Sequence, residues 1–399
     1  MADERLDLDQ AISRVLAHAE PLESRPVPLR KALGCTLAED VVAELPVQPF
    51  DNSAMDGFAI RAADAATPPT RLQVVGESRA GHPAERGLGP GEAIAISTGA
   101  MLPAGADAVV RAERTSRRNG EVTIAAAARS GQDVRRAGED LAPGEIAIER
   151  GTTLGPAELG VLASLGLAEV RCHHRPRVAV VTSGDELLEP GEPMRPGGIY
   201  DTNSHTIPAL AERAGARVIS VDRVGDDPEA TRDAIGAALR ADVAIVCGGV
   251  SVGEHDHVKE GFAWHDVRQV FWRLALKPGG PAWFGARKRT LAFGLPGNPV
   301  SAMVVFQLLV RPALRALAGA RANPARAVAV LEEPCERAAG RLSALRCELT
   351  LGEEGWRAKP RPRQGSHVLS SMLGADALAL IPAGEGAVAA GERVEVELL

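Results

Sequence analysis

The stretch VAIVCGGVSVGEHDHVK, residues 243–259, joins a short apolar segment to a turn rich in glycine and charge. Its first five residues are all apolar, as in a strand that is buried on both faces of a parallel sheet. Two glycines follow at once, and then a serine, a third glycine, two acids, two histidines and a lysine. Small and charged side chains at the end of a buried strand are typical of a ligand-binding loop in an α/β domain.

The same rhythm recurs through residues 175–323. Three further apolar segments end in glycine and polar residues: RVAVVTSGDEL (177–187), ARVISVDRVGDD (216–227) and TLAFGLPGNP (290–299). Two of them lead into helix starts, because Asp227 and Asn298 can each cap a helix and the proline that follows fits its first turn. Alternating strands and helices predict a parallel sheet with helices on both faces. We therefore expect an α/β domain here.

The remaining segments are mostly β-like. Residues 24–174 consist of short apolar pieces broken by proline and glycine, which predicts hairpins and turns, with one short helix over 156–165. Residues 324–399 again alternate like strands, which favours a small barrel or sandwich. Residues 6–19 carry an apolar stripe and are expected to form an amphipathic helix.

Composition excludes several classes of function. With 45 Lys and Arg against 52 Asp and Glu, and with 3% aromatic residues, the chain is poorly suited to binding nucleic acid. Its five cysteines never form a C-x-x-C pair, so neither a disulfide framework nor a zinc site is indicated. The first ten residues lack an apolar signal core, and the longest apolar helical run, residues 302–310, is shorter than the ~20 residues that span a bilayer. We expect a cytoplasmic protein without a membrane partner.

The loops of the α/β domain are expected to meet at one edge of the sheet, where ligands bind in open α/β folds. Glycines there let backbone N–H groups approach an anion. Acids in the same loops would repel a phosphate unless a divalent cation lay between them. Glu186, Asp226 and Asp256 offer oxygen ligands from three loops, and Mg²⁺ takes one or two carboxylates together with water and substrate phosphate. The sequence therefore predicts an anion cradle beside a magnesium site.

An alternative for each acid is that it only caps a helix. Ser183 and Glu186 have the spacing of a capping box. Asp226 and Asp227 are expected to divide the work, with Asp227 capping the following helix and Asp226 facing the ligand.

Four motifs occur in a fixed order along the chain. They are FDNSAMDGFA (50–59), TSGDEL (182–187), GGVSVGEHD (248–256) and GLPGNPVSA (294–302), and GQDVRRAGED, IYDTN, LALKPG and RQGSH lie between or after them. In these motifs the chain resembles the molybdopterin molybdenumtransferase family, whose members insert molybdate into adenylylated molybdopterin. The C-terminal domain of animal gephyrin is similar. The resemblance covers nearly the whole chain.

The resemblance implies a multidomain fold of α/β and β domains in an elongated homodimer. The central α/β domain would resemble the molybdopterin adenylyltransferases, and the active site would lie between it and the β-rich domain of the partner subunit. The expected domains are an N-terminal helix (1–23), a linking domain (24–43 and 143–174), a β-rich inserted domain (44–142), the α/β molybdopterin-binding domain (175–323) and a C-terminal barrel-like β domain (324–399).

The resemblance also implies roles for residues of this chain. Asp56 and Thr98 would reach the substrate from the neighbouring subunit, Asp140 would be needed for activity, and Glu186, Asp226 and Asp256 would be catalytic and metal-binding. The implied substrate-binding residues are Ser183, Gly184, Asp185, Gly248, Gly249, Ser251, Gly253, Lys277, Pro296, Gly297, Asn298 and Pro299. The implied molybdate-binding residues are Lys277, Arg273, Pro281, Arg363 and Ser366.

Some of these roles have alternatives. Asp56 and Gly57 could simply build a tight Asp-Gly turn. Arg363 has a guanidinium fork suited to oxyanions, yet its basic segment could equally be a solvated loop. Three residues depart from the family: Gly280 replaces a frequent lysine, Arg273 replaces another, and Phe58 replaces a tyrosine.

The implied activity is molybdate insertion with Mg²⁺-dependent release of AMP, with other proteins of molybdenum cofactor biosynthesis as further partners. A molybdopterin adenylyltransferase is one alternative, although it would need ATP and a shorter chain. A binding scaffold with a weakened molybdate site is another, favoured by Gly280. A nicotinamide dehydrogenase is remote, since no G-x-G-x-x-G opens a helix after a strand.

Overall fold

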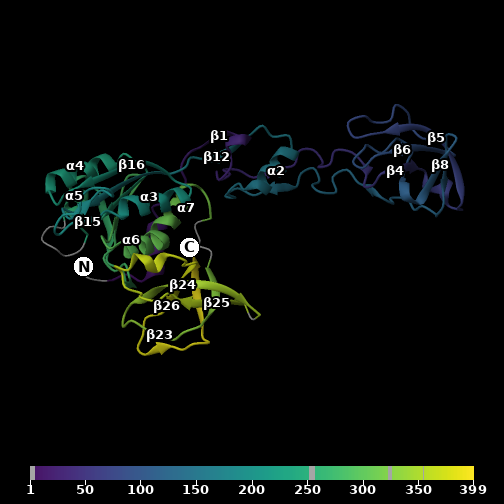
Figure 1. Ribbon diagram of the computed structural model, residues 1–399. Coiled ribbons are helices and arrows are strands. Elements are labelled where there is room, and N and C mark those ends of the chain that lie inside the picture. Colours follow the sequence, from purple (N-terminus) through teal and green to yellow (C-terminus); the bar gives the residue numbers. More distant parts are fainter. Residues whose placement is uncertain (1–4, 251–256, 322–325, 354) are drawn as a thin grey trace. The chain divides into compact units, whose positions relative to one another are not determined.

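The chain forms two compact units. The computed structural model describes residues 5–250, 257–321, 326–353 and 355–399. The first unit comprises Met1–Ala38, Gly151–Gly155 and Val170–Leu399, and the second comprises Glu39–Arg150 and Pro156–Glu169 (Figure 1). The segments expected to link the domains, 24–43 and 143–174, contribute residues to both units.

A six-stranded sheet forms the centre of the first unit, in the order β16-β13-β17-β21-β20-β18. Its strands are β13 (Arg177–Ser183), β16 (Arg217–Val224), β17 (Val243–Cys247), β18 (Arg268–Trp272), β20 (Trp283–Arg287) and β21 (Thr290–Leu295). The first four in spatial order are parallel, as predicted. Strands β20 and β18 were not among the predicted strands, and each runs antiparallel to its neighbours. The connection from β20 to β21 is a tight turn, too short for the crossover that a parallel pair needs.

Helices cover both faces of this sheet, as predicted (Figure 1). On one face lie α1 (Leu8–Leu16), α3 (Asn203–Arg213) and a long helix made of α6 (Pro299–Val305), η4 (Phe306–Val310) and α7 (Arg311–Leu317). On the other lie α4 (Pro228–Ala238) and α5 (Val258–Trp264). Along β13, Val178 and Val180 join the first cluster while Ala179 and Val181 join the second. This alternation is that of a strand buried on both sides.

The long helix agrees with the helix expected to start at Asn298 and Pro299. It runs over Pro299–Leu317, 19 residues, and its composition is apolar enough to cross a membrane. However, 78% of its most apolar window is buried inside the molecule, as in the core helix of a folded domain. A π-helical turn, η4, precedes Pro312, whose missing N–H disturbs the regular ladder.

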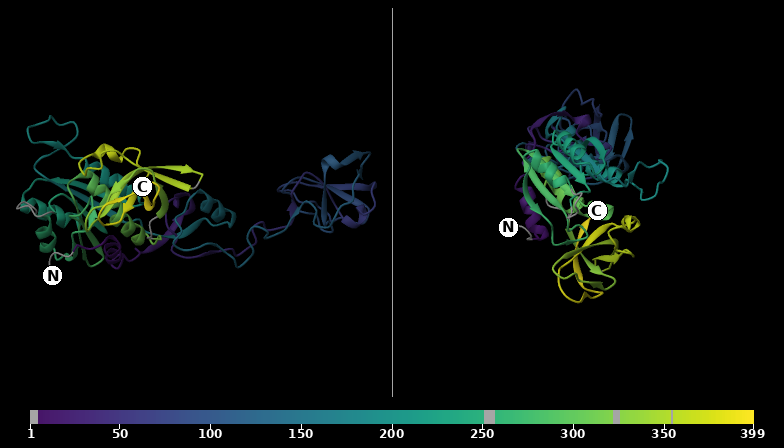
Figure 2. Two further views of the ribbon diagram at one scale, coloured as in Figure 1. Left: turned by 90° about the horizontal axis from the view of Figure 1, so that it is seen from below. Right: turned by 90° about the vertical axis from the view of Figure 1, so that its left-hand side faces the viewer.

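The C-terminal strands of the first unit close into a barrel, which confirms the predicted small β domain (Figure 2, where these strands run from green to yellow). They are β22 (Arg326–Leu331), β24 (Leu342–Gly352), β25 (Gly355–Pro360), β26 (Ala377–Ile381) and β28 (Arg393–Leu398). Closure follows because β24 pairs with β25 on one side and with β26 on the other. The short strand β19 (Leu276–Lys277) attaches the α/β chain to β24, and β23 (Cys335–Glu336) pairs with β27 (Ala387–Val388).

Two short strand pairs and two single turns complete the first unit. Strand β1 (Ser24–Pro28) pairs with β12 (Glu169–His173), and β14 (Leu187–Leu188) pairs with β15 (Ile199–Tyr200). The single turns η1 (Leu29–Lys31) and η5 (Leu369–Met372) are 3₁₀ helices.

The second unit is largely β, as predicted, with a six-stranded sheet in the order β7-β4-β6-β5-β9-β8. Its strands are β4 (Gly57–Ile60), β5 (Thr70–Ser78), β6 (Glu92–Ile96), β7 (Ala108–Arg111), β8 (Thr115–Arg118) and β9 (Glu121–Ile124). The pairs β3 (Asn52–Ser53) with β10 (Val134–Arg135) and β2 (Val41–Val42) with β11 (Ile146–Ile148) accompany it, as do η2 (Ala62–Ala65), η3 (Ala112–Arg114) and α2 (Pro156–Ser164). The last is the helix expected over 156–165.

Candidate functional site

The carboxyl ends of the four parallel strands lie side by side. In the ladder register, Ser183 stands opposite Val224, Thr182 opposite Cys247, and Cys247 opposite Leu295. The loops that follow β13, β16, β17 and β21 therefore leave the sheet at neighbouring points. The expectation that these loops share one edge is confirmed.

The two antiparallel strands bring further residues to the same edge. Trp283, the first residue of β20, pairs with Gly294 near the end of β21, and Trp272, the last residue of β18, pairs with Trp283. Arg273, expected to bind molybdate, directly follows Trp272, and Pro281, expected to do the same, lies two residues before Trp283. They accordingly lie beyond the edge from which the glycine loops emerge.

Glycine is required where two of the loops meet. Gly248 has a φ of 98°, and a Cβ built on it would lie 2.5 Å from the carbonyl oxygen of Ser183. Gly297 lies at an ordinary contact distance, since its Cβ would lie 3.7 Å from the Cα of Gly248. The backbones of the β13, β17 and β21 loops thus approach one another directly, and the N–H of Gly248 donates to the carbonyl of Leu295 at 3.0 Å.

Asp226 links the loops after β13 and β16. Its carboxylate lies 3.4 Å from the Ser183 hydroxyl and 3.5 Å from the backbone nitrogen of Asp185, while its own N–H donates to Asp185 Oδ1 at 3.1 Å. Asp227 instead caps α4 by accepting from the N–H of Ala230 at 2.7 Å. The capping half of the predicted division is confirmed, and Asp226 is left half-buried between two loops.

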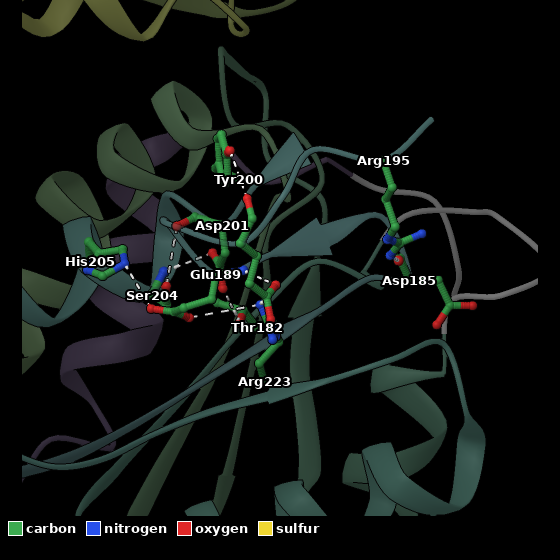
Figure 3. Close-up of polar contacts among 10 residues, drawn as sticks. Thr182, Asp185, Glu189, Arg195, Tyr200, Asp201, Ser204, His205 and Arg223 are labelled. Carbon is green, nitrogen blue, oxygen red and sulfur yellow. Dashed lines mark hydrogen bonds and ion pairs between the residues drawn. The ribbon is translucent and has the colours of Figure 1, made fainter. Parts of the chain in front are cut away.

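The capping-box alternative for Ser183 and Glu186 is wrong. No helix follows β13; the N–H of Leu187 closes a turn on the carbonyl of Gly184, and the chain enters β14. Glu186 is exposed at this turn. Arg195 donates from its guanidinium to the carbonyl of Asp185, which ties a distant loop to the same turn (Figure 3).

A buried polar network beneath this turn was missed by sequence reasoning (Figure 3). Thr182 donates from its hydroxyl to Asp201 at 2.6 Å, and Asp201 also accepts from the N–H of Ser204 at 3.1 Å. Both Thr182 and Asp201 are 1% exposed. Two residues further on, Asn203 donates from its side-chain amide to the carbonyl of Gly297 at 2.8 Å. The IYDTN motif could have indicated this network, because its acid, Asp201, shortly precedes a helix and its amide, Asn203, begins that helix.

Asp201 also influences the thiol at the end of β17. Complete burial raises the pKa of Cys247, and the nearby charge of Asp201 raises that pKa further. This thiol is therefore protonated at neutral pH and packs as a small apolar side chain.

Exposed ion pairs hold the segment between β14 and α3 (Figure 3). Glu189 lies 3.7 Å from His205 and 3.9 Å from Arg223, and Arg223 lies 3.8 Å from Glu192. Tyr200 donates to the carbonyl of Glu192 at 3.0 Å. Such exposed pairs contribute little to stability, about 0–1 kcal/mol each, so they serve mainly to position the segment.

Cations gather around Trp272 at the same edge. The Arg273 guanidinium lies 4.2 Å and the Lys259 ammonium 3.8 Å from the centre of its ring. Trp272 donates to the carbonyl of Val250, in the loop after β17, at 3.0 Å. The exposed Lys277 ends β19 and pairs across the ladder with Ser343 of the barrel.

The barrel contributes a residue to this region. Asn298 begins α6, as predicted, but its side chain makes no capping bond. It donates instead to the hydroxyl of Ser366 at 3.3 Å, which brings a barrel loop to the loop after β21. Arg363, three residues earlier, is exposed and has a φ of 61°.

The second unit contains its own polar cluster. Asp56 accepts from the backbone N–H of Thr98 at 2.7 Å and from its hydroxyl at 3.1 Å. The tight-turn alternative is wrong, because Gly57 lies within β4 and pairs with Ile96 and Arg111. Asp140 is exposed, and its backbone N–H donates to Val47 at 3.3 Å. Asp56, Thr98 and Asp140 thus belong to a different unit from Glu186 and Asp226.

Ion pairs hold the loop that precedes Asp140. Asp133 forms a two-pronged pair with Arg111 at 2.9 and 3.0 Å, and this pair holds the pKa of the Asp133 carboxyl below its usual value. Asp51 accepts from the N–H of Ala137 and from Arg136, and both bonds lower the pKa of Asp51.

Three predicted site residues, Ser251, Gly253 and Asp256, lie outside the described residues. Within the part of the chain that is described, no group of three or more His, Cys, Asp or Glu side chains is arranged to hold a metal ion. The described donors at the edge, Asp185, Glu186 and Asp226, are all oxygen ligands. Such a set fits a hard cation that keeps waters and binds substrate phosphate, as Mg²⁺ does, better than a closed protein cage.

Comparison with known families matches the chain along nearly its whole length. The description "MoeA N-terminal region (domain I and II)" matches residues 6–166, "Probable molybdopterin binding domain" matches 179–316, and "MoeA C-terminal region (domain IV)" matches 328–399.

Individual relatives agree with these matches. Molybdopterin molybdenumtransferase of Haemophilus influenzae is 39% identical over 98% of this chain and 98% of its own length. Molybdopterin molybdenumtransferase 1 of Mycobacterium tuberculosis is 33% identical, again over 98% of both chains. The crystal structure of the molybdopterin biosynthesis protein MoeA from Pyrococcus horikoshii OT3 is similar with a TM-score of 0.85 and 29% identity, covering 99% of this chain and 100% of that chain.

Proposed function

The chain belongs to the molybdopterin molybdenumtransferase family, and from that premise we propose that it inserts molybdate into adenylylated molybdopterin with release of AMP. Its relatives are transferases of molybdenum cofactor biosynthesis. The adenylylated substrate, the release of AMP and the use of Mg²⁺ are the finer parts of the proposal.

One observation carries the proposal: glycine loops and carboxylates from separate strands meet at one edge of the sheet. The loops at Gly248 and Gly297 pack closely there, and the start of α6 adds the positive end of a helix dipole. An anionic pterin phosphate would bind in this cradle. Ser183, Gly184 and Asp185 would line it on one side and Gly249, Pro296, Asn298 and Pro299 on the other.

Molybdate would bind where cations meet the barrel. Lys277 and Arg273 supply positive charge, and Ser366 supplies a hydroxyl beside Asn298. Pro281 and Arg363 would complete this wall. Tetrahedral oxyanions are bound well by such a mixture of charge and hydrogen-bond donors.

Asp226 and Glu186 would hold Mg²⁺ together with Asp256 and substrate phosphate. The cation would supply Lewis-acid polarisation of the phosphoanhydride that joins the pterin to AMP. The protein's own part is to hold Asp226 in place through Ser183 and the backbone of Asp185. A carboxylate that lacked these contacts would be free to turn into solvent.

Asp56, Thr98 and Asp140 would act on the substrate of the partner protomer in a homodimer. This composite arrangement can be tested by mixing Asp56→Asn and Asp226→Asn chains, each inactive by itself. A mixed dimer would contain one intact site, so random mixing would restore roughly a quarter of the wild-type activity. No restoration in a mixture that is shown to form mixed dimers would contradict a shared site.

The central test compares two neighbouring acids. Asp226→Asn is expected to lower AMP release by about 10²-fold or more, because the substituted amide no longer offers a charged oxygen. Asp227→Asn is the matched control, since Asn caps a helix as well as Asp does, and it should change AMP release less than about twofold. Equal activity of the two variants would overturn the role of Asp226.

The same assay separates the alternatives. An adenylyltransferase would consume ATP and release pyrophosphate, whereas the proposed enzyme releases AMP without ATP. A binding scaffold would bind molybdopterin and release nothing.

A further inference from the structure

A second cavity lies at the opposite edge of the parallel sheet. Its volume is about 830 Å³, within the range of small-molecule sites. Arg177 and Arg217 are the first residues of β13 and β16, and Asp242 and Arg289 immediately precede β17 and β21. Segments of β1 and β12 form the facing wall. The cavity therefore opens at the amino ends of the strands whose carboxyl ends form the proposed active site.

The lining is strongly basic. Among its fifteen residues are six arginines or lysines and two histidines, against two carboxylates. Asp242 is engaged with Arg177 through bonds of 3.0 and 3.2 Å, and Arg289 lies 3.6 Å from Glu20. The excess positive charge is therefore not consumed by the acids nearby.

Three cations remain available in this cavity. Arg25, Lys31 and Arg217 are exposed and form no ion pair within the described part of the chain. Arg175 is held at the wall, where its guanidinium donates to the carbonyl of Leu33 at 2.8 Å. Several unpaired charges around a cavity of this size favour a ligand with more than one anionic group.

The thiol of Cys35 lies in the wall of this cavity. Cys35 is buried, lines the cavity and lies next to Cys172. The hydrogen bond from Cys172 lowers the pKa of Cys35 to about 6, and the charges of Arg175 and Arg25 lower it as well. The Cys172 thiol has the largest effect on this pKa, and the two arginines favour the thiolate as they would favour another anion in the wall.

We propose that this cavity binds a small polyanion with two or more phosphate-type groups, at a site separate from the proposed active site. The guanidinium and ammonium groups of Arg25, Lys31 and Arg217 would neutralise it, and Arg175 would orient it. The chemistry of recognition is that of tetrahedral oxyanions held by arginine forks.

The test uses inorganic pyrophosphate as the probe and Cys35 as the reporter in the full chain. Iodoacetamide modifies thiolates, and peptide mass analysis identifies Cys35 among the five cysteines. Pyrophosphate is expected to slow alkylation of Cys35, because a bound anion blocks access and raises the pKa of the thiol. The half-protecting concentration then measures binding in this cavity and nowhere else.

Substitutions test whether the proposed cations bind pyrophosphate. Arg25→Ala and Arg217→Ala should each raise the half-protecting concentration by about fivefold or more, as expected for loss of a charge-assisted contact. Arg30→Ala is the matched control, since Arg30 is an exposed neighbour of Lys31 that does not line the cavity. It should leave the half-protecting concentration unchanged.

Three results would contradict the proposal. One is the absence of any protection by pyrophosphate at low ionic strength. Another is an equal loss of protection in Arg30→Ala, which would show a diffuse surface effect. Lys277→Ala should keep the protection, because Lys277 lies at the other edge; loss of protection there would also contradict a separate site. None of these assays needs molybdate insertion, so their outcome is independent of the proposed enzymatic function.

Discussion

The two edges of the central sheet share the same four parallel strands and carry opposite chemistry. At the carboxyl edge, glycines and the carboxylates of Asp185 and Asp226 gather beside helix starts. At the amino edge, Arg177 and Arg217 open the strands and line a basic cavity. In a parallel α/β domain, helices begin at the first edge and end at the second, and a helix dipole favours anions at its start and cations at its end. The difference therefore follows from the direction of the strands.

The close packing of loops at the carboxyl edge can be disrupted by a substitution at Gly248. Gly248→Ala would place a Cβ 2.5 Å from the Ser183 carbonyl at a φ of 98°. We expect a loss of about 2–4 kcal/mol in the free energy of unfolding and a fall of about 10²-fold in AMP release, because the loops must separate.

The control for this change is Gly191→Ala. Gly191 has a φ of 104°, yet nothing lies within 4 Å of its added Cβ. It should cost only the backbone strain, about 1 kcal/mol, and leave activity intact. Denaturant unfolding and AMP release measure both quantities, and similar costs at the two glycines would refute the crowding argument.

Two buried thiols, one beside each edge, provide a second test of the chemical difference between the edges. The alkylation rate of Cys35 should rise through pH 6 and level off above about pH 7, since its pKa is lowered to about 6. Between pH 5 and pH 7 the increase should be about tenfold, as the thiolate fraction grows. Cys247, with a raised pKa, should stay unreactive over this range.

Residue-specific alkylation across pH measures both profiles. A midpoint for Cys35 near the ordinary thiol value would mean that neither Cys172 nor the cationic wall lowers its pKa. Cys172→Ala should move the midpoint upward, because the bond from Cys172 is the largest cause of the shift.

Positive charge can be added to the carboxyl edge at Gly280. A Cβ on Gly280 would lie 3.4 Å from the carbonyl of Leu276 and 3.6 Å from that of Leu274, which are ordinary contacts. Gly280→Lys is therefore expected to fold normally and to lower the molybdate concentration for half-maximal turnover by about three- to fivefold.

Gly279→Lys is the matched control for this variant. Gly279 has a φ of 115°, and its Cβ would lie 2.6 Å from Val305, so the same charge should there destabilise the protein. The expectation would be wrong if Gly279→Lys lowered the molybdate concentration for half-maximal turnover while Gly280→Lys destabilised the protein. Turnover against molybdate concentration and thermal unfolding distinguish the two.

The smallest effect is expected from neutralising Asp242, an acid that is paired with Arg177 at the amino edge. Asp242 accepts from the backbone N–H of Arg177 at 2.8 Å and from its side chain. Asp242→Asn should cost about 1–2 kcal/mol, seen as a drop of a few degrees in Tm. It should also tighten pyrophosphate protection of Cys35, since Arg177 is released. Asp233→Asn, at an exposed helix position, should change neither quantity.

Local patterns predicted much of the α/β domain. The apolar strands, the glycine turns after them and the helix starts at Asp227 and Asn298 were all expected and found. Each depends on a few neighbouring residues, whose backbone preferences and capping bonds are nearly independent of the rest of the chain. The prediction that the loops share one edge followed from these patterns, because parallel strands all end on the same side of a sheet.

Prediction failed where one local pattern fits two structures. Ser183 and Glu186 have capping-box spacing, yet the chain turns into β14 because that strand pairs with β15. Strand β20 was not predicted, and the short turn that joins it to β21 makes this pair antiparallel.

Residue order along the chain was thus enough to specify the repeated strands, their glycine-rich ends and the family motifs. Tertiary packing alone decided that Thr182 buries its bond to Asp201, that Ser366 reaches Asn298, and that Arg25 and Arg217 face one cavity. The physical reason is distance in sequence. Helix caps and strand periodicity arise among near neighbours, whereas a polar network or a charged cavity exists only after remote segments have been brought together.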